Sequence, residues 1–206
     1  MLTVIISLLP IKYRARTVAL SRRWCTLWLR TPVDILNVHK ICHGYRQRLD
    51  AFPQILGSHD GPIKGLITGK FRSNGKDRAK LDEWFRSPAI DQLKKLSYND
   101  GHMRLLPTSA LRFAPTLCVA KFMKFQSPLN DAPALFLPRL KHLEIIAVRI
   151  PKNDMEHVLC GCTALEFIRL QAMNWSSTLH TPPGLSGLFM CVAGAATRDH
   201  KRWTTI

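Results

Sequence analysis

The sequence contains no long hydrophobic run. No segment approaches the ~20 consecutive apolar residues that cross a bilayer as a helix, and the apolar start, MLTVIISLLP, has no basic residue before it. A secretory signal peptide places a basic region ahead of its apolar core. We therefore expect neither a membrane span nor a signal peptide, and no membrane partner.

Acidic residues are also scarce. The 206 residues include 14 Asp and Glu against 30 Lys and Arg, for a formal net charge of +16. Such an excess permits binding to nucleic acid, to an anionic membrane or to an acidic protein, without choosing among them. The 46% of hydrophobic residues excludes a compositionally disordered chain. The length suits one ordinary domain, or a small module with a medium one.

Residues arranged for catalysis or metal binding are lacking as well. The six cysteines are spread along the chain rather than concentrated as in a small disulfide scaffold, which favours reduced thiols in the nucleus or cytoplasm. The His- and Cys-containing segments 39–43 and 157–162 each lack a second pair of ligands at zinc-site spacing. No Ser/His/Asp or Cys/His set can be assembled by spacing. We predict no catalytic residue, no metal and no cofactor, and hence no enzyme.

An amphipathic basic segment occupies residues 1–33. VIISLLP predicts a short helix or turn that ends at Pro10, because proline disfavours the helical conformation in the residue before it. Tyr13 to Leu29 contain neither Gly nor Pro, which predicts a basic helix within residues 12–30. Four apolar residues share one face of this helix, and all six charges of the segment are positive. The four are Leu20, Trp24, Leu27 and Trp28.

This helix allows two interpretations. In the first, arginines of the helix bind nucleic-acid phosphates, and the affinity falls steeply with salt. In the second, the tryptophan stripe is a packing face, either for the module itself or for a partner protein, since aromatic residues and Arg are enriched in interfaces. The tryptophans lie on the apolar stripe rather than among the arginines, so the protein interface is our main prediction and nucleic acid the alternative. The arginines are Arg14, Arg16, Arg22 and Arg23.

Residues 81–173 contain an internal repeat. The pattern L-x-x-L-x-L, with apolar variants, occurs four times at intervals of 24, 23 and 25 residues. This spacing is typical of a leucine-rich repeat, in which each unit forms a short strand and a returning helix or loop. One unit cannot bury its own apolar face, so stacked neighbours form the core. The four units begin at Leu93, Leu117, Leu140 and Leu165.

The remaining segments lack this pattern. Residues 34–80 are irregular, with a turn-rich GSHDGPIKG, and we interpret them as a connecting segment that leads into the repeats. Residues 174–206 have small residues and prolines and lose the repeat, which predicts a loosely ordered tail. The expected fold class is α/β: a small helical module followed by a short repeat solenoid.

The first segment also resembles a known motif. IISLLPIKYRARTVALSRRWCTLWLRTP is similar to the F-box of plant F-box proteins with leucine-rich repeats, with its Leu-Pro, spaced basic residues and Ser-Arg-Arg-Trp-x-x-Leu-Trp helix. The resemblance continues through SHDGPIKG, LDEWFRSPAIDQLKKL and LPRLKHLEI, and is strongest to grass-type members. It covers residues 4–173.

The resemblance implies the substrate-recognition subunit of a Skp–cullin–F-box ubiquitin ligase, in the nucleus or cytoplasm. Its F-box would bind a Skp-type adaptor, and through it a cullin, while its repeats bind a target protein of unknown identity. The family's opening Leu-Pro-x-x-Leu-Leu helix is absent from this sequence, which implies a truncated F-box with an impaired adaptor surface. By match to the motif, the adaptor-binding residues are Leu8, Leu9, Pro10, Leu20, Trp24, Leu27 and Trp28.

Overall fold

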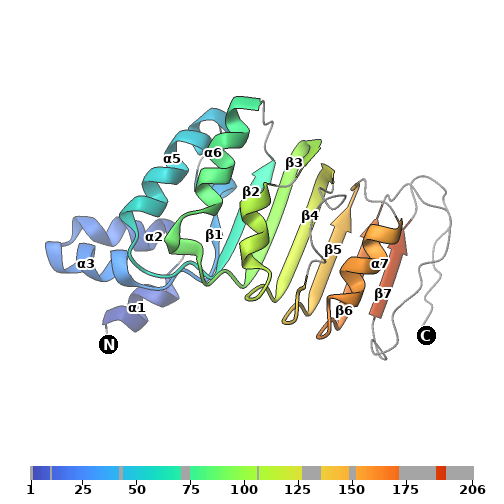
Figure 1. Ribbon diagram of the computed structural model, residues 1–206. Coiled ribbons are helices and arrows are strands. Elements are labelled where there is room, and N and C mark those ends of the chain that lie inside the picture. The colour runs from blue at the N-terminus through green and yellow to red at the C-terminus, as the bar shows by residue number, and fades with distance from the viewer. Residues whose placement is uncertain are drawn as a thin grey trace.

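A sheet of parallel strands runs through the molecule, with the N-terminal helices at one end (Figure 1). The computed structural model describes residues 2–9, 11–41, 44–70, 75–105, 107–126, 136–148, 152–171 and 189–193. Seven strands lie in the order of the sequence, and every neighbouring pair is parallel. Because parallel neighbours need a crossover, each connection returns the chain to the start of the next strand.

The strands are short, and helices alternate with several of them. The strands are β1 (Leu36–Asn37), β2 (Gly65–Lys70), β3 (Lys95–Leu105), β4 (Val119–Gln126), β5 (His142–Ile146), β6 (Phe167–Gln171) and β7 (Phe189–Ala193). The helices are α1 (Leu2–Leu8), α2 (Ile11–Arg16), η1 (Thr17–Ala19), α3 (Arg22–Arg30), α4 (Val38–Ile41), α5 (Tyr45–Ser58), α6 (Gly75–Phe85), η2 (Pro88–Ile90), η3 (Thr108–Phe113) and α7 (Lys152–Cys160). The predicted α/β class is therefore confirmed.

The hydrophobic core lies between the sheet and the helices α5, α6 and α7, which share one side of the sheet (Figure 1). The middle position of the repeat pattern is in register from strand to strand, and its residues are buried. The first position is buried in the same way, just before each strand. The middle row contains Leu96, Ala120, Leu143 and Ile168, and the first row contains Leu93, Leu117, Leu140 and Leu165. The four predicted strands are thus confirmed as β3 to β6.

Two further units precede the predicted repeats. Val33, Leu36 and Val38 are buried with the spacing of the pattern, and so are Ile63, Leu66 and Thr68. Leu36 pairs with Leu66 in the sheet, and Leu66 pairs with Leu96. Residues 34–80, which we interpreted as a segment that leads into the repeats, therefore contribute two strands of the same sheet. These units were missed because they start 30 residues apart and one ends in a threonine.

The sheet also continues into the predicted tail. Residues 189–193 form β7, in which Met190 is the partner of Ile168 in β6. The first position of the pattern would fall on Gly187, so the segment carries no apolar triplet by which it could be identified in the sequence. Residues 172–188 and 194–206, and with them the rest of the prediction for 174–206, lie outside the described residues.

The N-terminal module consists of separate short helices. The predicted helix in VIISLLP is confirmed as α1, whereas the single helix predicted within residues 12–30 is wrong. The chain forms α2 and η1, then turns at Ser21, whose backbone is extended at φ −172° and ψ 165°. Serine is favoured at the residue before a helix, and the Thr17 hydroxyl donates to the carbonyl of Arg14 at 2.6 Å where α2 ends.

Candidate functional site

Exposed apolar side chains gather in the N-terminal module. The structure describes eight exposed large hydrophobic residues, and five of them lie within the first 20 positions. Such a concentration is typical of a surface that meets another protein. The five are Val4, Ile5 and Leu8 of α1, Tyr13 of α2, and Leu20, which directly follows η1.

Helix α3 lies at the surface and packs against the rest of the chain along one side. None of its residues is fully buried. Trp28 is half-buried and packs against the core of the sheet, and its ring centroid lies 5.2 Å from that of His59. Trp24 is also half-buried, but among the described residues it is not part of that packing. The two tryptophans of the predicted stripe therefore have different surroundings.

A loop of three residues, His59, Asp60 and Gly61, leads from α5 toward β2 and binds the end of α3; we call it the 59–61 loop. The backbone N–H groups of Asp60 and Gly61 both donate to the carbonyl of Leu29, each at 2.9 Å. His59 Nε2 lies 3.0 Å from the carbonyl oxygen of Thr31. A carbonyl can only accept, so the neutral ring must carry its proton on Nε2.

Burial controls the ionisation of His59. The residue is only 6% exposed. Burial lowers the pKa of His59 below its ordinary value, and the nearby Arg14 adds to this effect; the hydrogen bond to Thr31 and the charge of Asp60 oppose it. The imidazole is therefore held in its neutral form at neutral pH.

Arg14 connects α2 to the same region. Its side chain is 8% exposed, although it belongs to a short surface helix. Nε donates to the carbonyl of Leu9 at 2.5 Å, and Nη1 donates to the carbonyl of Pro32 at 3.3 Å. This arginine is thus a structural residue, and it is not free to bind phosphate as the nucleic-acid alternative supposed.

The helices bring the predicted adaptor residues into one module. Helix α1 contacts α3, and α3 contacts η1. Leu8 and Leu20 are exposed, whereas the other described members of the set are half-buried; Pro10 lies outside the described residues. The half-buried members are Leu9, Trp24, Leu27 and Trp28.

Sequence reasoning missed His59 and the burial of Arg14. His59 binds a carbonyl 28 residues away, and Arg14 binds one 5 residues away and another 18 residues away, so the contacts that join them to α3 have no local spacing. The one local signal is the segment SHDG, in which a glycine follows two polar residues in a turn.

The face of the sheet opposite helices α5, α6 and α7 presents a second set of side chains. Residues between the buried positions alternate to this face. In one row Ser97, Lys121, Glu144 and Arg169 are neighbours on successive strands. Lys121 and Glu144 form an ion pair at 2.7 Å. In the preceding row the rings of His142 and Phe167 lie 5.8 Å apart.

The described residues contain no group of three His, Cys, Asp or Glu side chains placed to hold a metal ion. Within 157–162, Cys160 is exposed whereas Cys162 is buried and donates its thiol to the carbonyl of Val158 at 3.1 Å. Burial raises the pKa of Cys162 to about 12, so the thiol is not a nucleophile. Cys42 and His43 of the other segment lie outside the described part of the chain. No helix in the described ranges is long and apolar enough to span a membrane.

Comparison with known proteins shows that the chain is similar to plant F-box proteins. It is 25% identical over 182 residues to an Arabidopsis thaliana protein named as FBD-associated F-box protein At5g56690, covering 83% of this chain and 45% of the relative. It is 26% identical over 173 residues to one named as F-box/LRR-repeat protein At3g28410, covering 81% and 35%. The chain thus spans less than half the length of these relatives. No solved structure matches.

The strongest family assignment concerns the repeats. Residues 81–192 match the family model described as "FBD-associated F-box protein At5g56370, LRR repeats". The matched range contains β3 to β6 and most of β7. Because the match covers more than half of the sequence, the chain belongs to the leucine-rich-repeat family of the FBD-associated F-box proteins of plants.

Proposed function

We propose that this chain is the substrate-recognition subunit of a Skp–cullin–F-box E3 ubiquitin ligase. Residues 2–30 are its F-box helices and bind a Skp-type adaptor, and the adaptor connects the chain to a cullin. The repeats stack as a solenoid and bind a target protein through the face of the sheet opposite helices α5, α6 and α7. The chain does no chemistry itself; it raises the effective concentration of the target near the ubiquitin-charged enzyme.

The observation that carries this proposal is the exposed apolar surface of the N-terminal helices. Leu8 is 79% exposed and Leu20 is 67% exposed, and Trp24 of the same module is half-buried. Leaving such side chains in water costs free energy that burial against a partner regains. The family assignment, and relatives named as F-box proteins, support an adaptor as that partner.

The proposal also covers the location of the protein. A ubiquitin-ligase subunit acts in the nucleus or the cytoplasm, where thiols stay reduced. The free thiols of Cys25, Cys118, Cys160 and Cys162 agree with such a compartment.

Adaptor binding tests the proposal directly. The Kd between the full chain and a plant Skp-type adaptor is measured by titration calorimetry, for the wild type and for Leu8→Gln and Leu20→Gln. Each substitution removes an exposed apolar side chain, so we expect about tenfold weaker binding with an unchanged melting temperature. Phe136→Gln is the matched control, because Phe136 is 61% exposed but lies outside the N-terminal helices.

A second protein, extended at its N-terminus by a Leu-Pro-x-x-Leu-Leu helix, distinguishes a chain that binds the adaptor by itself from one that binds only with this helix. Adaptor binding by either the chain or the extended protein supports the proposal. Failure of both to bind would exclude the F-box assignment. Binding that weakens equally in Leu8→Gln and in Phe136→Gln would exclude the N-terminal helices as the adaptor surface.

A further inference from the structure

We propose that the 59–61 loop fixes the orientation of the N-terminal helices on the repeat sheet, with His59 as the positioning residue. The consequence for function rests on the function proposed above: the loop would set how the bound adaptor is oriented relative to a target on the sheet. That the loop holds α3 in place on the sheet depends only on the contacts of the loop with α3.

The loop supplies donors where α3 has unsatisfied acceptors. The last four carbonyl groups of a helix have no partner within the helix. Two backbone N–H groups of the loop bind the carbonyl of Leu29, and the His59 ring binds that of Thr31. Three hydrogen bonds from a distant segment therefore converge on the end of one helix.

The loop is itself a rigid continuation of the sheet. Immediately after Gly61, the carbonyl of Pro62 accepts from the N–H of Val33 at 3.0 Å, and the carbonyl of Val33 accepts from the N–H of Lys64 at 2.8 Å. Val33 and Ile63 form a parallel bridge beside β1 and β2. Motion of α3 relative to the loop would thus be motion relative to the whole sheet.

The contact leaves no room for a side chain at position 61. A Cβ atom on Gly61 would lie 2.8 Å from the carbonyl oxygens of both Arg30 and Thr31. These are backbone atoms, which cannot move aside as a flexible side chain can. Trp28 covers the His59 ring from the helix side, and Arg14 ties α2 to Pro32 next to Thr31. Both α2 and α3 are therefore attached at residues 29–32.

Fixed geometry matters to a ligase subunit because ubiquitin transfer requires the target lysine to reach the charged enzyme. Holding two groups in one orientation favours a reaction, because the rotational and translational entropy has already been lost before the reacting step. A flexible joint at residues 30–33 would dilute this advantage. His59 thus positions the N-terminal helices on the sheet, and other residues contact the adaptor and the target.

Hydrogen–deuterium exchange on the full chain tests the mechanical claim. His59→Leu removes the donor to Thr31, so we expect exchange in peptides covering 22–32 and 58–63 to become about tenfold faster. Peptides from β4 to β6 should keep their wild-type rates. His59→Gln should restore most of the protection, because its side-chain amide places an N–H donor close to the position of Nε2. His157→Gln, at an exposed histidine of α7, is the matched control.

Two results would overturn the proposal. Unchanged exchange at 22–32 in His59→Leu would show that the loop does not hold α3. Equal acceleration from α3 to β6 would make His59 a residue of global stability. Adaptor binding, measured on the same proteins, tests the proposed function separately: failure of both the wild-type chain and its N-terminally extended form to bind would refute the F-box assignment without affecting the exchange result.

Acid should destabilise the fold through the buried His59 ring, which loses more by being charged than its hydrogen bond to Thr31 regains. The folded pKa of His59 lies below its unfolded value of 6.5, so the unfolded chain binds the proton more readily and stability falls as pH drops below about 6.5. The charged groups facing the ring are Asp60 of the loop and Arg14 of α2. We expect the melting temperature to fall more steeply between pH 7.5 and about 5.5 in the wild type than in His59→Gln, which cannot titrate.

His157→Gln is the control for replacing a histidine by glutamine away from the loop, because its side chain is exposed in α7. Identical pH profiles for the wild type and His59→Gln would contradict a buried neutral His59 at this contact.

Discussion

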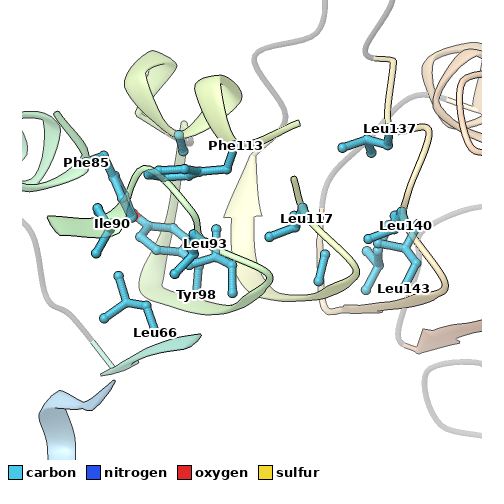
Figure 2. Close-up of a cluster of buried hydrophobic side chains, with 14 of the residues drawn as sticks. Leu66, Phe85, Ile90, Leu93, Tyr98, Phe113, Leu117, Leu137, Leu140 and Leu143 are labelled. Atoms are coloured by element: carbon cyan, nitrogen blue, oxygen red, sulfur yellow. The ribbon is translucent and has the colours of Figure 1, made fainter. Parts of the chain in front are cut away.

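Replacing Phe85 with alanine is expected to lower the free energy of unfolding by about 3–5 kcal/mol. Phe85 is 1% exposed at the end of α6, where the helix meets the sheet. Its ring centroid lies 6.1 Å from that of Tyr98 in β3 and 5.9 Å from that of Phe113 in η3 (Figure 2). The substitution therefore removes one buried ring and two aromatic contacts, and leaves a cavity among three elements.

Urea unfolding followed by far-UV circular dichroism measures this change. Phe136→Ala is the control, since this phenylalanine is 61% exposed and its truncation should cost less than about 0.5 kcal/mol. The dependence of the free energy on urea should be similar in both variants, as the surface exposed on unfolding hardly changes. A loss at Phe85 no larger than that at Phe136 would contradict the central place of this aromatic cluster.

The rows of the core could be predicted from sequence because the repeat is local. Leu96, Ala120 and Leu143 each occupy the same place in a unit of 23–25 residues, so the spacing alone puts them in register. The pattern does not need three apolar residues in every unit. Thr68 stands in the third position, and its hydroxyl donates to the carbonyl of Ser97 at 3.2 Å. A search for apolar triplets therefore passes over it.

The joint between helices and sheet could not be predicted in the same way. His59 acts on Thr31 through the folded chain, and Gly61 is required only because the backbone of Arg30 lies against it. Neither fact has a periodic signature. The break at Ser21 belongs to the same class: serine is compatible with a helix start, but nothing in the spacing of the tryptophan stripe excludes a helix that continues through it.

Substitutions at Trp24 and Trp28 allow packing within the chain to be measured separately from binding to a partner. Trp28→Ala is expected to lower the free energy of unfolding by about 2–3 kcal/mol, because the half-buried ring packs on the core and on His59. Trp24→Ala is expected to cost about 1 kcal/mol or less. Under the proposed function, Trp24→Ala weakens adaptor binding by tenfold or more.

Urea unfolding should be followed by circular dichroism here, since each substitution removes a fluorophore. Equal losses of stability at the two positions would show that α3 packs with its whole stripe, and would remove Trp24 from the adaptor surface. Adaptor binding that is unaffected by Trp24→Ala would also remove Trp24 from the adaptor surface.

A double-mutant cycle then assigns the Trp28 effect to its contact with the loop. Trp28→Ala and His59→Gln remove groups whose rings are in contact, so their effects should fail to add by about 0.5–1.5 kcal/mol. Trp24→Ala and His59→Gln share no described contact, and their effects should add within about 0.5 kcal/mol. Additivity in both cycles would mean that Trp28 stabilises the fold through the core alone. Coupling found only for Trp28 would show that Trp28 belongs to the contact between α3 and the 59–61 loop, and would leave Trp24 for the partner.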